Sequence, residues 1–298
     1  LLKNCIKSIL RSNLIKSKSK FEIIIFDNGS NINEIESYKS IKKLDSRIKI
    51  MLSKKNLGPA KARNLASNKA KYKYICYLDN DTEVDKNFHK KPLSIYKKNN
   101  NIGIIQLKLL KYNTNKFDYA GDYISNYGIL KRVIDTGKID FGQIKTGTQI
   151  LSAKSAGMFI SKKAFLDSGG FDKDYFIYCE ETDLGWRVCL KGYKNIFCNE
   201  SVVYHHWSSS AIILSNIKDY LNFFHGSKNY IITLYKNVEA KNQYLTLYVI
   251  FFWIMLSLFY FLTFKFKRSY YILSGIRFFL FNIKKINKKR KTIQKKCS

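Results

Sequence analysis

Short apolar runs typical of strands alternate with segments typical of helices, and turn residues or acids follow the runs. The run FEIIIF at 21–26 is rich in β-branched residues and ends in the turn cluster DNGS, and the run YKYICYL at 72–78 ends in DND. Between them, 59–70 begins with Pro59, which is favoured at the first position of a helix. This alternation predicts an α/β fold with a mostly parallel sheet flanked by helices.

The same alternation extends in both directions. Residues 1–15 have the apolar spacing of a helix. Because an α/β chain is expected to place a strand before such a helix, we expect that the sequence is a fragment without its first strand before Leu1. Further along, the patterns predict strands over 102–110 and 155–161, a helix over 180–192 and an extended segment over 195–206.

An uncharged apolar segment lies at 244–264. Its 21 residues are enough, at about 1.5 Å each, to cross a hydrocarbon layer of roughly 30 Å. A buried core helix is the alternative. Twelve Lys and Arg and no acid follow from Lys265 onward, and such a tail is expected on the cytoplasmic side. With the N-terminal part on the same side, the segment would form a hairpin, re-enter, or lie along the membrane.

The chain carries 53 basic and 22 acidic residues, a formal net charge of +31, in a composition that is 46% hydrophobic. This apolar content excludes a disordered polycation. The charge predicts an acidic partner, either nucleic acid, anionic lipid or a phosphorylated substrate. The basic tail beside the apolar segment favours anionic lipid. Because the sequence contains no recognised nucleic-acid-binding motif, we predict no nucleic-acid partner and keep that function as the weaker alternative.

Carboxylates directly follow two of the predicted strands. Asp27 follows the run at 21–26, and Asp79 and Asp81 form a D-x-D after 72–78. Ligands of open α/β sheets bind beyond the carboxyl ends of the strands. Carboxylates on a turn can hold Mg²⁺ or Mn²⁺, which neutralises phosphate oxygens. A turn that simply favours Asp and Asn is the structural alternative.

A second acidic group begins the predicted helix at 180–192. Glu180, Glu181 or Asp183 can supply a general base that removes a proton from a hydroxyl group. The alternative is that the helix dipole favours acids in the first turn, with Asp183 paired to Arg187 four residues later. The density of aromatic and acidic residues just before the helix favours the catalytic interpretation.

Three further residues are candidates for binding. His205, after an apolar extended run, can complete a metal site with the aspartates. Arg63 and Asn64, near the start of a predicted helix, can face a diphosphate, with an ordinary solvated helix face as the alternative. The sequence has neither a P-loop nor a Rossmann glycine pattern, which disfavours P-loop and dinucleotide-binding functions.

The order of these segments resembles the family 2 glycosyltransferases with a GT-A fold, in particular their rhamnosyltransferase-like branch. The similarity covers roughly residues 1–235. Five motifs carry it, which are IIIFDNGSN (23–31), NLGPAKARNLA (56–66), YICYLDNDTEVD (74–85), SAGMFISKKAFLDSGGFDKDYFIYCEETDLGWRVCLKGYK (155–194) and VVYHHWSSS (202–210).

The resemblance implies roles in donor binding for several of these residues. Asp27 corresponds to the acid that contacts the nucleoside base, and Arg63 lies in the segment beside the nucleotide. Asp79 and Asp81 correspond to the D-x-D that holds ribose and the divalent metal, and His205 corresponds to the family's late histidine.

The resemblance also implies the catalytic group. Asp172, in GGFD, corresponds to the acceptor and sugar side of the pocket. Glu180 and Glu181 occupy the Glu-Asp pair of the family, whose second member is the usual base. Because this chain has Glu-Glu there, Glu181 is the implied base and Asp183 is the fallback.

The activity implied is inverting transfer of a sugar from a nucleotide-diphosphate sugar to a hydroxyl group, with Mg²⁺ or Mn²⁺ as cofactor. The acceptor would be a glycan or a lipid-linked molecule in the synthesis of a cell-surface polysaccharide or glycolipid. We expect a catalytic domain over 1–235 on the cytoplasmic face, and a membrane-associated helix or hairpin with a basic tail over 236–298. A catalytically inactive, membrane-bound relative is the alternative, which the expected absence of the first strand favours.

Overall fold

The computed structural model describes residues 1–17, 19–206 and 217–295. Its largest sheet contains six strands, which are β3 (Tyr74–Tyr77), β4 (Thr82–Val84), β5 (Ile102–Lys111), β6 (Phe117–Tyr119), β9 (Met158–Ser161) and β10 (Lys194–His205). The order is β3-β9-β5-β10-β4, with β6 beside β5. Only β5 and β10 run parallel among these neighbours, and the other pairs are antiparallel. The α/β class is confirmed, whereas the pairing is mixed rather than mostly parallel.

Two further strands, β1 (Ile23–Asn28) and β2 (Ile48–Ser53), form a separate parallel pair. Helix α2 (Ile32–Lys42) connects them. Helix α1 (Leu2–Arg11) packs beside β4 and buries its apolar face in the core, as the spacing of residues 1–15 predicted. The strand expected before Leu1 lies outside the sequence and stays a prediction.

The remaining elements of this part of the chain are helices, a short hairpin and a 3-10 turn. They are α3 (Pro59–Lys69), α4 (Lys90–Lys98), the hairpin strands β7 (Asp122–Ile124) and β8 (Leu130–Arg132), the 3-10 turn η1 (Ser155–Gly157), α5 (Lys162–Asp167) and α6 (Glu180–Leu190). Gly58, the residue before α3, has φ of 78°, and a Cβ there would lie 2.7 Å from the carbonyl oxygen of Phe176. A glycine at this position therefore lets the loop before α6 approach the start of α3.

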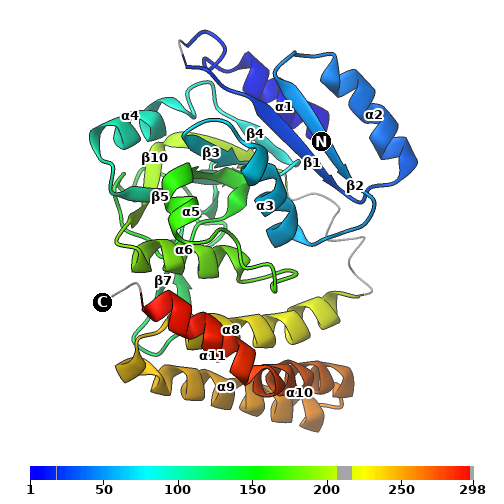
Figure 1. Cartoon of the computed structure of the whole chain (residues 1–298), viewed down its shortest axis with the longest axis vertical. Coiled ribbons are helices and arrows are strands. Elements are labelled where there is room, and N and C mark those ends of the chain that lie inside the picture. Colours follow the sequence, from blue (N-terminus) through cyan, green and yellow to red (C-terminus); the bar gives the residue numbers. More distant parts are fainter. Residues whose placement is uncertain (18, 207–216, 296–298) are drawn as a thin grey trace.

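A layer of helices lies at the opposite end of the molecule from β1 and β2 (Figure 1). It consists of the π-helical segment η3 (Tyr220–His225), α8 (Gly226–Asn237), the short η4 (Ala240–Asn242), α9 (Tyr244–Leu262), α10 (Phe266–Phe281) and α11 (Ile283–Gln294). These helices share a hydrophobic core that also includes Tyr175. One helix, Ala240–Leu262, is long and apolar enough to span a membrane. The domain boundary predicted at 235/236 falls within α8, and the division into two domains stays a prediction.

Part of the basic tail contacts the protein itself. In α11, Lys285 lies 2.7 Å from Asp174, and Lys289 lies 2.6 Å from Asp172. The guanidinium of Arg290 donates to two backbone carbonyls at the end of α8. The sequence favoured anionic lipid as the partner of this charge, and the structure shows that some of the basic residues also bind α11 to the rest of the chain.

Candidate active site

The D-x-D aspartates and His205 meet at one edge of the large sheet. Asp79 and Asp81 lie in the turn between β3 and β4, and His205 is the last residue of β10. Strand β10 pairs with β4 so that His205 lies opposite Thr82, which places the imidazole beside Asp81. One ligand atom from each of the three predicted metal-binding residues lies within 4.8 Å of the others. The structure therefore brings these three side chains together.

Asp118 on β6 fixes the ring of His205. Its Oδ2 lies 2.9 Å from Nδ1 of the imidazole, and Oδ1 of Asp81 lies 3.3 Å from Nε2. Burial disfavours the charged imidazole, but the hydrogen bonds to Asp118 and Asp81 raise the pKa of His205 to about 9. A buried carboxylate behind the ring is typical of a metal-binding histidine, and this one holds the ring with Nε2 beside Asp81.

The cluster concentrates negative charge at a partly exposed position, where the Asp79 side chain is more exposed than that of Asp81. Burial raises the pKa of Asp79, Arg63 offsets part of this rise, and Glu181 and Asp81 add to it. A divalent cation would relieve the repulsion between these carboxylates. Two carboxylates and an imidazole form a donor set that suits Mn²⁺, and the oxygens suit Mg²⁺. The residues present therefore fit the predicted cofactor.

Arg63 on α3 connects this cluster with the glutamates of α6. Its Nη2 lies 3.5 Å from Asp79 Oδ1, while Nη1 lies 3.1 Å from Glu180 Oε1 and 3.6 Å from Glu181 Oε1. The guanidinium also lies 5.7 Å from the centre of the Phe171 ring, within range of a cation–π contact. A partly buried arginine among carboxylates is suited to receive a diphosphate group, which it can bind in a bidentate manner.

The two glutamates at the start of α6 have different surroundings. Glu181 Oε1 accepts hydrogen bonds from the backbone N–H of Ser155, at 2.7 Å, and from the Ser155 hydroxyl. Neither of these bonds nor the Arg63 contact involves Oε2. The side chain of Glu181 is 22% exposed, against 8% for Glu180. Burial and repulsion from Glu181 raise the pKa of Glu180 to about 7, against the attraction of Arg63. Glu181 is therefore the more accessible carboxylate, and Glu180 is a buried partner of Arg63.

The backbone just before α6 has an unusual conformation. Tyr178 and Cys179 have φ of 67° and 63°, which costs a residue other than glycine about 1–3 kcal/mol each. The amide of Asn229 on α8 donates to the carbonyls of Ile177 and Tyr178, at 2.7 and 3.0 Å. Asn229 is completely enclosed. These two hydrogen bonds hold the turn that leads into the glutamate pair.

Asp183 and Asp172 lie in a buried network of ion pairs. Asp183 lies 2.7 Å from Arg187 and 2.9 Å from Lys236 of α8. The same lysine and Lys289 of α11 each lie 2.6 Å from Asp172. The side chain of Asp183 has no exposed surface, so an acceptor has no route to it. The network joins α6 to α8 and α11, and the pairing of Asp183 with Arg187 is the one that the helix spacing indicated.

Asp183→Asn is expected to lower the free energy of unfolding by about 3–5 kcal/mol, because it leaves Arg187 and Lys236 short of a buried counter-charge. Urea denaturation followed by circular dichroism measures this loss. Turnover per folded molecule should change little. Loss of turnover at unchanged stability would instead identify Asp183 as the base.

Asp27 and Asn64 both make hydrogen bonds within the protein. Asp27, at the carboxyl end of β1, accepts hydrogen bonds from the Tyr38 hydroxyl at 2.7 Å and from two backbone N–H groups of its own turn. Burial opposes ionisation, but these hydrogen bonds lower the pKa of Asp27. Both polar atoms of the Asn64 amide bond the backbone of Phe171, at 2.8 and 2.9 Å. Asn64 therefore fastens the GGFD loop to α3.

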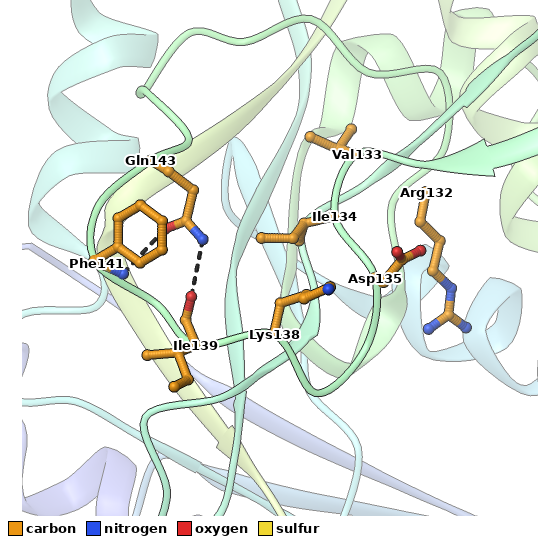
Figure 2. A pocket seen from close by; sticks show the side chains of 8 residues that line it. All are labelled: Arg132, Val133, Ile134, Asp135, Lys138, Ile139, Phe141 and Gln143. Atoms are coloured by element: carbon orange, nitrogen blue, oxygen red, sulfur yellow. Dashed lines mark hydrogen bonds between the residues drawn. The ribbon is translucent and has the colours of Figure 1, made fainter.

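A separate hollow of about 380 Å³ contains none of the predicted site residues. Figure 2 shows it beside the loop after β8, where the Gln143 side chain bonds the carbonyl of Ile139 and the N–H of Phe141. Thr136 of the same loop donates to the carbonyl of Asp118. The loop that lines the hollow thus contacts β6, the strand that carries Asp118. Its lining residues are Arg132, Val133, Ile134, Asp135, Lys138, Ile139, Phe141 and Gln143.

Comparison with known proteins identifies the class. The family model for glycosyl transferase family 2 matches residues 1–165. The chain therefore belongs to glycosyl transferase family 2, as the motifs indicated. An uncharacterised glycosyltransferase of Haemophilus influenzae is 27% identical over 211 residues, which cover 71% of this chain and 74% of that protein.

Another relative and two solved structures extend the comparison. The poly-β-1,6-N-acetyl-D-glucosamine synthase of Staphylococcus aureus is 28% identical over 61% of this chain and 42% of its own. GalNAc-T7 solved with UDP, GalNAc and Mn²⁺ has a TM-score of 0.56 at 20% identity, over 75% of this chain and 43% of that one. TarS residues 1–349 from S. aureus with UDP-GlcNAc has a TM-score of 0.57 at 12% identity, over 82% and 66%. These structures confirm the GT-A fold, and the chain spans less than half of the synthase and of GalNAc-T7.

Proposed function

We propose that the protein is an inverting glycosyltransferase that moves a hexosyl or rhamnosyl group from a nucleotide-diphosphate sugar to a hydroxyl group. One observation carries the proposal: Arg63 contacts both Asp79 of the acidic cluster and the Glu180–Glu181 pair. Inverting transfer needs a group that receives the departing diphosphate and a base for the incoming hydroxyl on the other side of the same carbon. The array around Arg63 offers both within one site.

The donor side of the site is formed by the residues after the strands. Asp27 would contact the nucleoside base, Asp79 the ribose, and Arg63 the diphosphate. Asp81, Asp79 and His205 would hold the divalent cation, which when bound neutralises charge on the leaving diphosphate. The relatives support this assignment, because GalNAc-T7 was solved with UDP and Mn²⁺ and TarS with UDP-GlcNAc.

Glu181 is the proposed general base. Ser155 holds its Oε1 atom, which leaves Oε2 to take the proton of the acceptor hydroxyl. A positioned carboxylate of this kind accelerates transfer by roughly 10²–10⁴-fold. Attack from the face opposite the diphosphate inverts the configuration at the anomeric carbon. Asp172 supports the acceptor side through the loop it anchors.

We also propose the setting in which the enzyme acts. The acceptor is a glycan or a lipid-linked molecule in polysaccharide or glycolipid synthesis, and the enzyme works at the cytoplasmic face of a membrane. The similarity to a polysaccharide synthase supports the product class, and the apolar helix Ala240–Leu262 beside a basic tail supports the location. The rhamnosyltransferase-like branch rests on the motifs alone.

A screen of nucleotide sugars tests the proposal. Release of nucleoside diphosphate is followed with UDP-, GDP- and dTDP-linked sugars in the presence of Mn²⁺ or Mg²⁺. We expect turnover of at least one donor, loss of that turnover with EDTA, and its return when Mn²⁺ is added. Binding of a nucleotide without turnover of any donor would favour the inactive relative instead.

Asn229→Ala tests how the base is positioned. Without the two hydrogen bonds from Asn229, the strained turn at Tyr178 and Cys179 is expected to relax and to displace Glu181. Because small misplacements are costly, we expect kcat to fall about 10- to 100-fold while the KM for the donor stays nearly constant. Steady-state kinetics measure both constants.

Two further variants show whether Asn229 acts through this turn. Asn229→Ala combined with Cys179→Gly should recover part of kcat, because glycine adopts positive φ without strain. Ser227→Ala is the matched control, since the Ser227 hydroxyl is buried on the same helix but bonds carbonyls of η3. Equal losses for Asn229→Ala and Ser227→Ala would assign the effect to general destabilisation.

A further inference from the structure

We infer that α9 and α10 form a hairpin that lies flat in the membrane interface, and that neither helix crosses the bilayer. This inference rests on the proposed membrane association. The sequence left open whether the apolar segment forms a hairpin, re-enters, or lies along the membrane. The choice of a flat hairpin follows from how α9 is attached to the rest of the protein.

Helix α9 is attached at both ends. Beside its first residue, the Gln243 amide donates to the carbonyls of Tyr235 and Val238 at the end of α8, at 3.3 and 3.2 Å. Near its last turn, the Tyr260 ring lies 5.1 Å from the ring of Phe223 in η3. The 19 residues of α9 cover about 28 Å. The helix therefore runs beside η3 and α8 over its whole length, and Figure 1 shows it across this end of the molecule.

Helix α10 is held in the same layer. The hydroxyls of Ser257 on α9 and Ser269 on α10 lie 2.8 Å apart. Arg268 donates to Asp219, just before η3, at 2.8 Å. At Gly275 the backbone approaches η3 so closely that a Cβ would lie 2.9 Å from the carbonyl oxygen of Phe224. A helix that crosses a bilayer projects away from the part of the protein that stays on one side of the membrane. Neither α9 nor α10 projects away from the protein in this manner.

The outer face of this hairpin is apolar and uncovered. No charged residue occurs over 244–264. Soluble monomers rarely expose continuous apolar patches beyond a few hundred Å². The large apolar side chains exposed on α9 are Tyr244, Leu247, Tyr248, Phe251, Phe252, Ile254, Met255, Leu258, Phe259, Phe261 and Leu262, and those on α10 include Phe266, Tyr270, Leu273, Phe278, Leu280 and Phe281.

The charges beside this face indicate lipid as its occupant. Exposed basic residues occur within the hairpin, at Lys265, Lys267 and Arg277, and on the following helix α11, at Lys284, Lys288 and Lys291. No acid follows Lys265 in the sequence. A second copy packed on the same face by two-fold symmetry would bring the basic residues of the two hairpins together. Anionic headgroups would neutralise them while the apolar face enters the acyl region. This arrangement also keeps the catalytic part and the basic tail on one side of the membrane.

Depth measurements along α9 test the inference on the full chain. Nitroxide spin labels are placed singly at Leu247→Cys, Phe251→Cys, Leu258→Cys and Leu262→Cys, and the signal of the labelled parent chain is subtracted. Immersion depth is read from collisions with oxygen and a nickel chelate, in vesicles of phosphatidylcholine with one third phosphatidylglycerol. We expect four similar depths, about 5–10 Å below the headgroups. A crossing helix would instead give depths that change by about 22 Å between 247 and 262.

Two charged variants give an independent measurement. Leu258→Glu should lower the vesicle partition coefficient at least tenfold, because it puts a carboxylate on the lipid-facing side. Leu166→Glu, at a leucine on α5 that is also exposed, should leave partitioning unchanged. Donor turnover in detergent is measured in parallel, so that failure of the transferase proposal is seen separately. Unequal depths, equal partitioning of both variants, or a stable dimer without vesicle binding would each overturn the inference.

Discussion

Replacing Glu181 by Gln is expected to lower kcat by about 10²–10⁴-fold, the usual contribution of a general base. The amide keeps the size of the side chain and can still accept from Ser155, but it cannot take a proton from the acceptor. Affinity for the nucleotide diphosphate should change little, since none of its proposed contacts is removed. Single-turnover kinetics at saturating donor measure the chemical step directly.

Glu180→Gln and Asp183→Asn are the matched controls for Glu181→Gln. Glu180 is buried against Arg63, and Asp183 is enclosed with Arg187 and Lys236. We expect both controls to retain far more of the chemical step than Glu181→Gln does. If Glu180→Gln abolishes transfer while Glu181→Gln keeps an activity close to that of the parent enzyme, the base is Glu180 and the assignment to Glu181 is wrong.

Asp81→Asn is expected to have the second large effect, which is a loss of affinity for the divalent cation. Asp81 supplies a carboxylate beside Nε2 of His205, and the neutral amide is a weaker ligand for a hard cation. We expect the Mn²⁺ concentration needed for half-maximal turnover to rise by about 10- to 100-fold, the range seen when support of a metal site is lost.

Glu83→Gln controls for the loss of one acid in the same turn. Glu83 lies 2.9 Å from His206 and outside the group of ligand atoms formed by Asp79, Asp81 and His205. We expect its Mn²⁺ dependence to match that of the parent chain. An equal response of Asp81→Asn and Glu83→Gln would mean that the metal is bound elsewhere.

The parts of the site predicted from the sequence are those that follow strands or begin helices. Asp79 and Asp81 follow a strongly apolar run, and Glu181 lies in the first turn of a helix with clear start and stop residues. Local pattern indicated these positions because it fixes where a strand ends. The direction of pairing has no such local signal, so the mixed sheet was not predicted.

The residues that sequence reasoning missed act through contacts far apart in the chain. Asp118 meets His205 across 87 positions, and Asn229 reaches the turn before α6 across about 50. The polar residues Asn229, Lys236 and Asn237 share one face of α8 and are all buried. Their helical spacing is also that of a solvated face. Only the packed structure shows that Asn229 holds the turn before α6 and that Lys236 and Asn237 contact Asp183.

The central claim is that the acidic cluster binds a nucleoside diphosphate through a divalent cation. Titration calorimetry of the full chain with UDP, GDP and dTDP, each with Mn²⁺ and with EDTA, tests it most directly. We expect at least one nucleotide to bind with Mn²⁺, EDTA to remove this binding, and Asp81→Asn to weaken it. Nucleotide binding that is equally strong with EDTA and in Asp81→Asn would show that the acidic cluster does not bind the nucleotide through a cation.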